Sequence, residues 1–460
     1  MFKRILIANR GEIAVRVFRA CRELDIEPVV VYSQADSEAL HVQLAEQAYC
    51  IGPARSADSY LNVDAILTVA QATGCDAIPP GYGFLSENAD FADACAQAGI
   101  AFIGPSGDVI RAMGNKAAAR KLMVAAGVPV VPGSDGAVDT AEEAKALADS
   151  IGYPVLIKAA AGGGGRGMRR VFEPDQLIPL FEEARSESVA CFGSGEMYLE
   201  QLILNPRHIE FQILADSQGH VIQLGDRDCS IQRRNQKLLE ESPSMALTPE
   251  LREKMGAAAV AAAKSAHYEN AGTIEFVLDQ EGNFYFIEMN TRIQVEHPVT
   301  ELVTGMDLVR EQIRIAAGLP LSRTQEEVAL HGHAIECRIN AEDPANDFRP
   351  CPGKIDFVHL PGGCGVRVDS CLYTGYDLPP YYDSLMAKIV VHAPTRLEAI
   401  RRMRRALEEL IVDGPETNAD LLHQILHHPD FVRGNYTTGF LEAHMDTLLA
   451  WSGSGEVAEA

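Results

Sequence analysis

The N-terminal part of the chain alternates between strand-like and helix-like patterns of apolar residues. A short apolar run at Arg4–Ala8 is typical of a strand, and apolar residues at helical spacing predict a helix from Gly11 to about Leu24. A second apolar run at Val29–Tyr32 completes a strand–helix–strand unit, which requires a parallel sheet. The same alternation predicts helices at Ala65–Ala72 and Ala89–Ala98 and strands at Asp76–Ile78 and Ile100–Ile103. Residues 1–113 are therefore predicted to form a doubly wound α/β domain.

Three further regions follow. Residues 114–340 predict a mixed α/β region, in which strands at Pro154–Ala159 and Met168–Phe172 flank a glycine run and an alanine-rich helix spans Leu251–Ala266. The glycine run belongs to a smaller unit at about 130–203. Residues 341–446 predict short strands with Pro-Gly turns and then a helix at Leu397–Leu410, and residues 447–460 predict a disordered tail.

The composition excludes several classes of protein. The chain has 460 residues, of which 47% are hydrophobic and 23% charged, so it can bury a substantial core. The formal net charge of −24 disfavours binding to nucleic acid or to an anionic membrane surface. No apolar run approaches the ~18 residues of a spanning helix. The ten cysteines show no C-x-x-C spacing, so we expect a cytoplasmic protein with reduced thiols.

The glycine run follows Lys158, at the end of a predicted strand, and is itself followed by a strand. Its glycines are Gly162, Gly163, Gly164, Gly165 and Gly167. A dinucleotide-binding loop would lead into a helix, and a P-loop would carry Gly-Lys-Ser/Thr, so both are disfavoured. The pattern instead predicts a hairpin flap whose backbone N–H groups close over phosphates, with a mobile surface linker as the alternative.

A predicted hairpin brings two carboxylates together. Strands at Thr273–Asp279 and Phe284–Asn290 flank a four-residue connection, and a turn centred between its second and third residues pairs Glu275 with Glu288. Two like charges directly opposed destabilise a hairpin unless a cation lies between them. The pair therefore predicts a divalent cation with oxygen ligands.

The chain beyond this hairpin is expected to continue the same face. A period of two places Asn290, Arg292, Gln294 and Glu296 on the side of Glu288. Mg²⁺ bridging phosphate oxygens fits this set better than Ca²⁺ does, because the protein supplies few carboxylates. The alternative is an amphipathic strand with a solvated face.

Three weaker signals accompany these two. The basic cluster Gln232–Lys237 either holds an anionic substrate or forms a solvated strand. Arg338 follows a strand and could supply a bidentate anion site, whereas a lone histidine such as His208 is more often structural. Together, these signals describe phosphoryl transfer at a nucleotide–magnesium site that is not a P-loop.

Four segments of the chain resemble the biotin carboxylase family of ATP-grasp enzymes. They are Ile7–Ala14, Pro80–Asn88, the glycine run and the highly specific segment Phe286–Pro298, and the resemblance extends from residue 1 to about 446. It implies an ATP-grasp fold, in which a doubly wound N-terminal domain, an ATP-grasp region with a glycine lid and a mixed C-terminal domain follow in order. It also implies ATP, Mg²⁺ or Mn²⁺, bicarbonate and carrier-bound biotin as cofactors and substrates.

The resemblance further implies a role for each candidate residue. The glycine flap would hold ATP together with Lys116, Lys158, Glu200, His208, Gln232 and Asn235. Glu275 and Glu288 would bind magnesium, with Asn290 near a second ion. Bicarbonate would be held by Lys237, Arg292, Gln294 and Val295. Glu296 would deprotonate bicarbonate for attack on the γ-phosphate. The resulting carboxyphosphate would break to CO₂ and phosphate, and Arg338 would stabilise the biotin enolate.

Four positions depart from the family pattern. Pro79, Asn115, Gln201 and Asn235 stand where the family usually has His, Asp, Lys and His. Asn235 cannot carry charge, so a retuned ATP site or a regulatory nucleotide-binding paralogue is an alternative. A further alternative is an ATP-grasp ligase that acts on another acceptor.

The expected partners follow from the same resemblance. The chain shows no Met-Lys-Met biotin-attachment sequence and no carboxyltransferase region. We therefore expect a separate subunit that acts beside a biotin carboxyl carrier protein and a carboxyltransferase. The resemblance also implies a homodimer. Arg16, Arg19, Glu23 and Arg367 match positions that the family uses at its dimer contact. Acetyl-CoA carboxylase, which begins fatty acid synthesis, is the expected complex, with propionyl-CoA or pyruvate as alternative acceptors.

Overall fold

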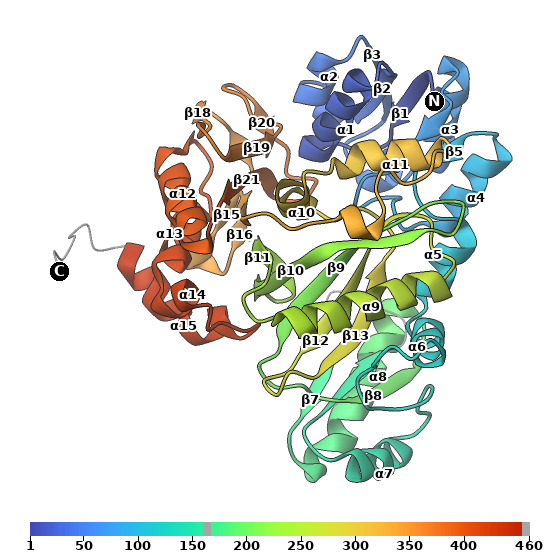
Figure 1. Ribbon diagram of the computed structural model, residues 1–460, viewed down its shortest axis with the longest axis vertical. Helices are drawn as coiled ribbons and strands as arrows, with labels where there is room; N and C mark the ends of the chain where they lie inside the picture. Colours follow the sequence, from blue (N-terminus) through green and yellow to red (C-terminus); the bar gives the residue numbers. More distant parts are fainter. Residues whose placement is uncertain (160–166, 453–460) are drawn as a thin grey trace.

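A computed structural model describes residues 1–159 and 167–452 and opens with a five-stranded parallel sheet (Figure 1). The order of its strands is β3-β2-β1-β4-β5. The strands are β1 (Arg4–Ile7), β2 (Glu27–Ser33), β3 (Gln47–Gly52), β4 (Ala77–Ile78) and β5 (Ala101–Phe102). The helices are α1 (Gly11–Glu23), α2 (Leu40–Leu44), α3 (Val63–Thr73), α4 (Ala89–Gln97) and α5 (Gly107–Gly114).

Helices cover both faces of this sheet because its strands are apolar on both sides. In β1, Ile5 and Ile7 pack with Val17 of α1, whereas Leu6 packs on the other face with Phe91 of α4. The predicted doubly wound α/β fold is therefore confirmed. The structure adds β3 and the short α2, which the apolar pattern did not predict.

An eight-stranded antiparallel sheet forms the centre of the molecule, in the order β13-β12-β9-β10-β11-β14-β21-β19. Helix α9 (Pro249–Ser265) lies across one face of it (Figure 1), where Met255 and Ala259 pack with Phe211 and Phe276. The strands are β9 (Arg207–Ala215), β10 (Val221–Arg233), β11 (Gln236–Ser242), β12 (Asn270–Leu278), β13 (Phe284–Asn290), β14 (His333–Asn340), β19 (Val366–Ser370) and β21 (Leu385–Ala393). Helices α10 (His297–Thr304) and α11 (Leu308–Ala316) follow β13.

A small lobe with its own core projects from the central sheet, at the bottom of Figure 1. Its sheet has the order β7-β6-β8, and Ile157, Phe181 and Leu199 are buried between this sheet and its helices. The elements are α6 (Lys116–Ala125), α7 (Ala141–Ile151), β6 (Val155–Ala159), β7 (Arg169–Val171), α8 (Leu177–Phe192) and β8 (Met197–Gln201), of which α6 joins the lobe to the central core. The glycines at 162–165 lie outside the described residues. Gly167 accepts a hydrogen bond from Ala159 N at 3.0 Å, so β6 and β7 pair as predicted.

The C-terminal region shares the central sheet, because β14 is hydrogen-bonded to β11 on one side and to β21 on the other. Its helices are α12 (Arg396–Glu409), α13 (Ala419–His427), α14 (Pro429–Arg433) and α15 (Phe440–Ser452). Its short strands are β15 (Glu342–Asp343), β16 (Arg349–Pro350), β17 (Gly353–Lys354), β18 (Phe357–His359), β20 (Asp377–Leu378) and β22 (Ile411–Asp413). Helix α15 runs to Ser452 and so includes the start of the predicted tail, whereas residues 453–460 lie outside the described residues.

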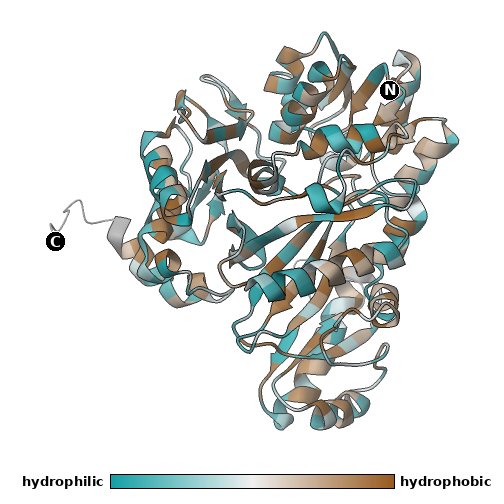
Figure 2. Cartoon of the chain, viewed as in Figure 1, coloured by the Kyte–Doolittle hydropathy of each residue, from teal (hydrophilic) through white to brown (hydrophobic). Residues whose placement is uncertain are grey.

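Hydropathy varies within these layers: the central strands mix apolar and polar residues, and the surrounding helices carry polar residues along part of their surface (Figure 2). Among the described residues, no helix combines the length and the apolar character needed to cross a membrane. All ten cysteines lie in the described residues and carry free thiols.

Candidate active site

A cleft of about 1570 Å³ lies where the N-terminal sheet, the small lobe, the central sheet and α15 meet. Most of the sequence-predicted candidates line it. They are Lys116, Lys158, Glu200, His208, Gln232, Asn235, Lys237, Glu275, Glu288, Asn290, Arg292, Gln294, Val295 and Arg338. The fold therefore brings residues that are far apart in the chain into one site.

Three carboxylates form a row across the central sheet. Glu288 on β13 is paired with Glu275 on β12, as the sequence predicts, and Glu275 is paired in turn with Glu210 on β9. Nearer the turn of this hairpin, β12 and β13 pair in a different register, in which Phe276 lies opposite Phe286. If that register continued, Glu288 would lie opposite Ile274. A β-bulge between the two parts shifts the pairing by one residue and brings the two glutamates together.

Lys237 supplies positive charge among these carboxylates. Its Nζ lies 2.5 Å from Glu210 Oε2, 3.0 Å from Glu275 Oε1 and 2.7 Å from Glu296 Oε1. Burial alone would lower the pKa of Lys237, but the three carboxylates raise it well above its ordinary value. The ammonium is therefore held cationic and compensates part of the buried negative charge.

The opposed glutamates differ in their affinity for a proton. Burial would raise the pKa of Glu275, but Lys237 and His208, whose Nε2 is 3.0 Å from Glu275 Oε2, lower it far below the ordinary value. Burial and the neighbouring charge of Glu275 raise the pKa of Glu288. A divalent cation beside Glu288 would offset both the burial of its carboxylate and the repulsion from Glu275. The residues present therefore fit the predicted metal.

Glu296 is held ionised between two cations. Its Oε1 accepts a hydrogen bond from Lys237, and its Oε2 accepts one from Arg338 Nη2 at 2.8 Å. Burial opposes ionisation, but Lys237, Arg338 and Arg227 lower the pKa of Glu296 well below its ordinary value. Arg338 Nη2 also lies 2.5 Å from Glu240 Oε1. A ligand that attracts these cations would raise the basicity of Glu296.

The segment after β13 departs from the predicted geometry. Extended pairing ends at Asn290, and bends and a turn lead to α10 at His297. The guanidinium of Arg292 donates to Asn290 Oδ1 at 3.1 Å and to Gln294 Oε1 at 2.9 Å, and Gln294 Nε2 donates to Glu275. The predicted period of two is therefore wrong for the backbone beyond Asn290, although the predicted side chains do converge.

The basic cluster forms a hairpin turn. Gln232 is paired with Lys237, and the two central residues, Arg234 and Asn235, have φ values of +48° and +66°. A two-residue turn with both φ values positive is typical of type I′, in which asparagine is favoured. Arg233 and Arg234 both contact Asp347, so only Lys237 of the three basic side chains is directed at the carboxylate row.

The small lobe contributes a second group of polar residues. Lys158 on β6 forms an ion pair with Glu200 on β8, and Arg120 Nη1 lies 3.8 Å from Glu200 Oε1. Lys116 is the exposed first residue of α6, and the side chain of Asn115 caps that helix by accepting from Ala118 N. Asn115 therefore performs the capping that its position requires.

Sequence reasoning missed three residues of this network. Glu210 belongs to the carboxylate row, and the fully buried Arg227 donates to Glu210 Oε1 at 2.5 Å and to Thr273 Oγ1 at 3.0 Å. Glu87 accepts a hydrogen bond from Arg292 Nε at 3.0 Å. The alternation of polar and apolar residues along Arg207–Ala215 could have identified Glu210.

Three of the four segments that carry the family resemblance, Ile7–Ala14, Pro80–Asn88 and Phe286–Pro298, touch one another. Asn9 Nδ2 donates to Pro80 O at 2.6 Å and to Tyr82 O at 2.8 Å, which joins the first two segments. Glu87, at the end of the second, holds Arg292 of the last. These segments therefore form one side of the cleft together.

Comparison with known proteins agrees with this arrangement. Family models match residues 1–110 ("Biotin carboxylase, N-terminal domain"), 115–324 ("Carbamoyl-phosphate synthase L chain, ATP binding domain") and 336–443 ("Biotin carboxylase C-terminal domain"). The chain is 59% identical over 441 residues to a biotin carboxylase of a Nostoc species, a match that covers 96% of this chain and 99% of the relative. It is 57% identical over 445 residues to biotin carboxylase 1 of Bacillus subtilis, at 96% and 99% coverage.

A solved structure shows the same fold over the whole chain. The biotin carboxylase domain dimer of the Hydrogenobacter thermophilus 2-oxoglutarate carboxylase, in complex with MgADP, ADP and bicarbonate, superimposes with a TM-score of 0.93. The sequence identity is 52%, and the match covers 100% of both chains. Because these relatives match at more than half of all positions and over nearly their whole length, the chain belongs to the biotin carboxylase family of ATP-dependent, ATP-grasp ligases.

Proposed function

We propose that this protein carboxylates biotin on a separate carrier protein, using ATP, bicarbonate and Mg²⁺ (or Mn²⁺). The observation that carries the proposal is the position of Glu296, between the ammonium of Lys237 and the guanidinium of Arg338 and next to the carboxylate row. An anion that binds beside Lys237 and Arg292 has an ionised carboxylate within reach to accept its proton. We propose that residues 1–113, 114–340 and 341–446 form the three domains of this enzyme.

The metal would be held by Glu275 and Glu288, with Asn290 close by. Glu288 has a raised pKa that a cation would restore, and Asn290 Nδ2 donates to Glu275 Oε1 at 2.8 Å. When bound, the metal would neutralise charge on the phosphate oxygens of ATP.

The nucleotide would occupy the wall of the cleft nearest the small lobe. Lys116 and Lys158 would contact its phosphates, Glu200 the adenine side, and His208 and Gln232 the floor. Asn235 lies in the adjoining turn, and the glycines at 162–165 and 167 would complete the flap. The apolar part of this wall, suited to a base, includes Ile203, Ile287 and Leu441.

The chemistry would proceed in two stages at the same anion site. Bicarbonate, held by Lys237, Arg292, Gln294 and Val295, would lose its proton to Glu296 and attack the γ-phosphorus, and ADP would leave. The resulting carboxyphosphate would break to CO₂ and phosphate. That phosphate would take the proton from the biotin ureido nitrogen, and Arg338 would stabilise the resulting enolate while the nitrogen attacks CO₂.

We further propose a homodimer that works with a biotin carboxyl carrier protein and a carboxyltransferase. The Hydrogenobacter relative is a dimer. In this chain Glu301 links Arg16 and Arg367, because its Oε1 lies 2.9 Å from Arg16 Nη2 and its Oε2 lies 2.6 Å from Arg367 Nη1. Arg19 and Glu23 lie exposed on α1. Acetyl-CoA is the acceptor we propose for the complex. Propionyl-CoA, pyruvate and 2-oxoglutarate are the alternatives. The last two are supported by relatives: the chain is 55% identical to a pyruvate carboxylase subunit of Methanothermobacter thermautotrophicus and 54% identical to the 2-oxoglutarate carboxylase small subunit of Hydrogenobacter thermophilus.

The test of the chemistry is ADP release from MgATP and bicarbonate, with and without free biotin. We expect biotin to stimulate release and Glu296→Gln to reduce it by about 100-fold or more, the usual contribution of a general base. The matched control is Glu281→Gln, which changes an exposed carboxylate in the turn between β12 and β13. ATP binding without bicarbonate-dependent release, restored by Asn235→His, would indicate a detuned regulatory paralogue instead.

The acceptor requires a separate test. The native complex, purified through this chain, is supplied with labelled bicarbonate and with acetyl-CoA, propionyl-CoA, pyruvate or 2-oxoglutarate in turn. Label transferred to acetyl-CoA alone would support the proposed acceptor, and label transferred to one of the others would replace it.

A further inference from the structure

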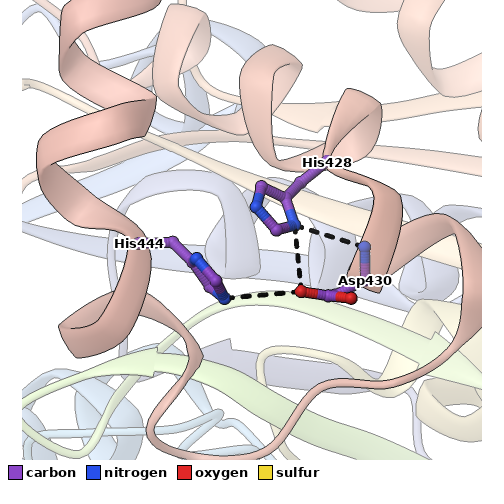
Figure 3. A group of neighbouring side chains, drawn as sticks. All are labelled: His428, Asp430 and His444. Carbon is purple, nitrogen blue, oxygen red and sulfur yellow. Dashed lines mark hydrogen bonds and ion pairs between the residues drawn. The ribbon is translucent and has the colours of Figure 1, made fainter.

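Two imidazoles and a carboxylate converge on one point in the C-terminal region, outside the cleft (Figure 3). His428 directly precedes α14, Asp430 lies in the first turn of that helix, and His444 projects from α15. One ligand atom from each residue lies within 4.8 Å of the other two. We propose that His428, Asp430 and His444 form a binding site for a single divalent transition metal of the zinc type, with an open position for water.

The separations between the atoms favour metal ligation over direct pairing. Asp430 Oδ2 lies 3.8 Å from His428 Nδ1 and 3.6 Å from His444 Nε2, both beyond hydrogen-bonding distance. Ligands placed tetrahedrally at about 2.0–2.1 Å from a zinc ion are roughly 3.4 Å apart. Side-chain adjustments of a few tenths of an ångström would therefore bring the Asp430 oxygen to ligand spacing from each nitrogen, and all three ligand atoms already lie within 4.8 Å of one another.

The donor set selects the class of ion. Two imidazole nitrogens and one carboxylate oxygen suit Zn²⁺, Co²⁺ or Ni²⁺, whereas Mg²⁺ prefers oxygen ligands alone. The site is thus chemically distinct from the carboxylate row proposed for Mg²⁺. Asp430 N donates to His428 Nδ1 at 3.3 Å, which shows that this nitrogen presents its lone pair toward Asp430. A metal would replace that long bond.

The surroundings position the two imidazoles in advance. Their ring centroids are 4.2 Å apart, and Phe440 contacts both rings, at centroid distances of 5.1 Å from His428 and 4.9 Å from His444. Phe440 is itself buried in the C-terminal core. Pro429 restricts the backbone between His428 and Asp430. Little conformational entropy would therefore be lost when the ion binds.

Metal binding would fasten one wall of the cleft. The ion would tie the start of α14 to the second turn of α15, and that helix contributes Leu441 and Met445 to the cleft. The connecting loop is already joined to the residue that precedes β9, because Thr438 N donates to Pro206 O at 3.0 Å. The inferred role is structural: the ion holds α15 in place beside the nucleotide site.

The test is titration of the full chain with Co²⁺ in excess Mg²⁺, followed by visible d–d absorption and by displacement with Zn²⁺. We expect a single tightly bound Co²⁺ with tetrahedral-type bands. His444→Ala and Asp430→Asn should weaken it by about 100-fold or more, because loss of even an outer-shell partner costs about 10–100-fold. His423→Ala, a histidine of α13 outside the cluster, is the matched control and should leave the affinity unchanged.

Two outcomes would overturn the proposal. Equal Co²⁺ affinity and spectra in the wild type, His444→Ala and Asp430→Asn would place the ion at exposed thiols or at the carboxylate row instead. Absence of tight Co²⁺ binding in the wild type would show that His428, Asp430 and His444 do not form a metal site. Circular dichroism and thermal unfolding in chelator verify that each variant is folded. Zn²⁺ should raise the unfolding temperature of the wild type and of His423→Ala, but not that of the two ligand variants.

Discussion

Two adjacent buried glutamates on β11 should respond in opposite ways to the same substitution. Glu240 lies directly opposite Glu336 on β14, and both side chains are fully buried. Burial raises the pKa of Glu240 to about 7, even though Arg338 opposes the shift. Glu241 points to the other face, where Arg396 donates at 2.7 and 3.1 Å and His333 at 2.7 Å. The charge of Arg396 and the hydrogen bond from His333 overcome burial and lower the pKa of Glu241 to about 2.

The magnitudes follow from linkage between proton binding and folding. Each pKa differs by about 2.5 from the value of 4.5 in the unfolded chain, which at about 1.4 kcal/mol per unit gives about 3 kcal/mol. For Glu240 the folded state binds its proton more tightly, so stability falls as pH rises from 4.5 to 7 and the full penalty applies above 7. For Glu241 the contribution is stabilising, complete above pH 4.5, and lost as pH falls through about 2.

We therefore expect Glu240→Gln to stabilise the chain above about pH 7 by up to about 3 kcal/mol, with the gain fading toward pH 4.5. Glu241→Gln should destabilise it by about 3 kcal/mol over that whole range, because it leaves Arg396 without its carboxylate. The assay is guanidinium unfolding followed by circular dichroism across the range. The reasoning is refuted if both variants lose similar stability, or if the effect of Glu240→Gln does not change with pH.

Three further substitutions test other parts of the structure. Gly81→Ala places a Cβ 2.9 Å from Asn9 Nδ2 at a φ of +67°, so it should unfold more easily than the control Gly83→Ala, which shares the positive φ but meets open space. Asn235→Val should destabilise the β10–β11 turn by about 1–2 kcal/mol in thermal unfolding, because a β-branched residue resists the left-handed region. Glu288→Gln should raise the Mg²⁺ concentration needed for half-maximal ADP release while leaving thermal stability in metal-free buffer equal or higher; unchanged Mg²⁺ dependence would exclude Glu288 as a ligand.

The sequence by itself determined those features that depend on neighbours along the chain. The apolar run of β1 and the helical spacing of α1 specify a parallel unit, since each pattern is read within a few residues. The hairpin that opposes Glu275 and Glu288 is equally local. Even there, the pairing depends on a bulge, and the segment beyond Asn290 turns where a simple period of two predicts an extended chain.

The tertiary structure decided which side chains share their charges. Lys237 forms ion pairs with Glu210, Glu275 and Glu296, which come from two other strands and the start of a helix. No spacing in the sequence predicts that these side chains lie together. Arg292 reaches back across the chain to Glu87 in the same way. The physical reason is that pKa values and ligand sets depend on burial and on distances of a few ångströms between strands, which only the packed sheet establishes.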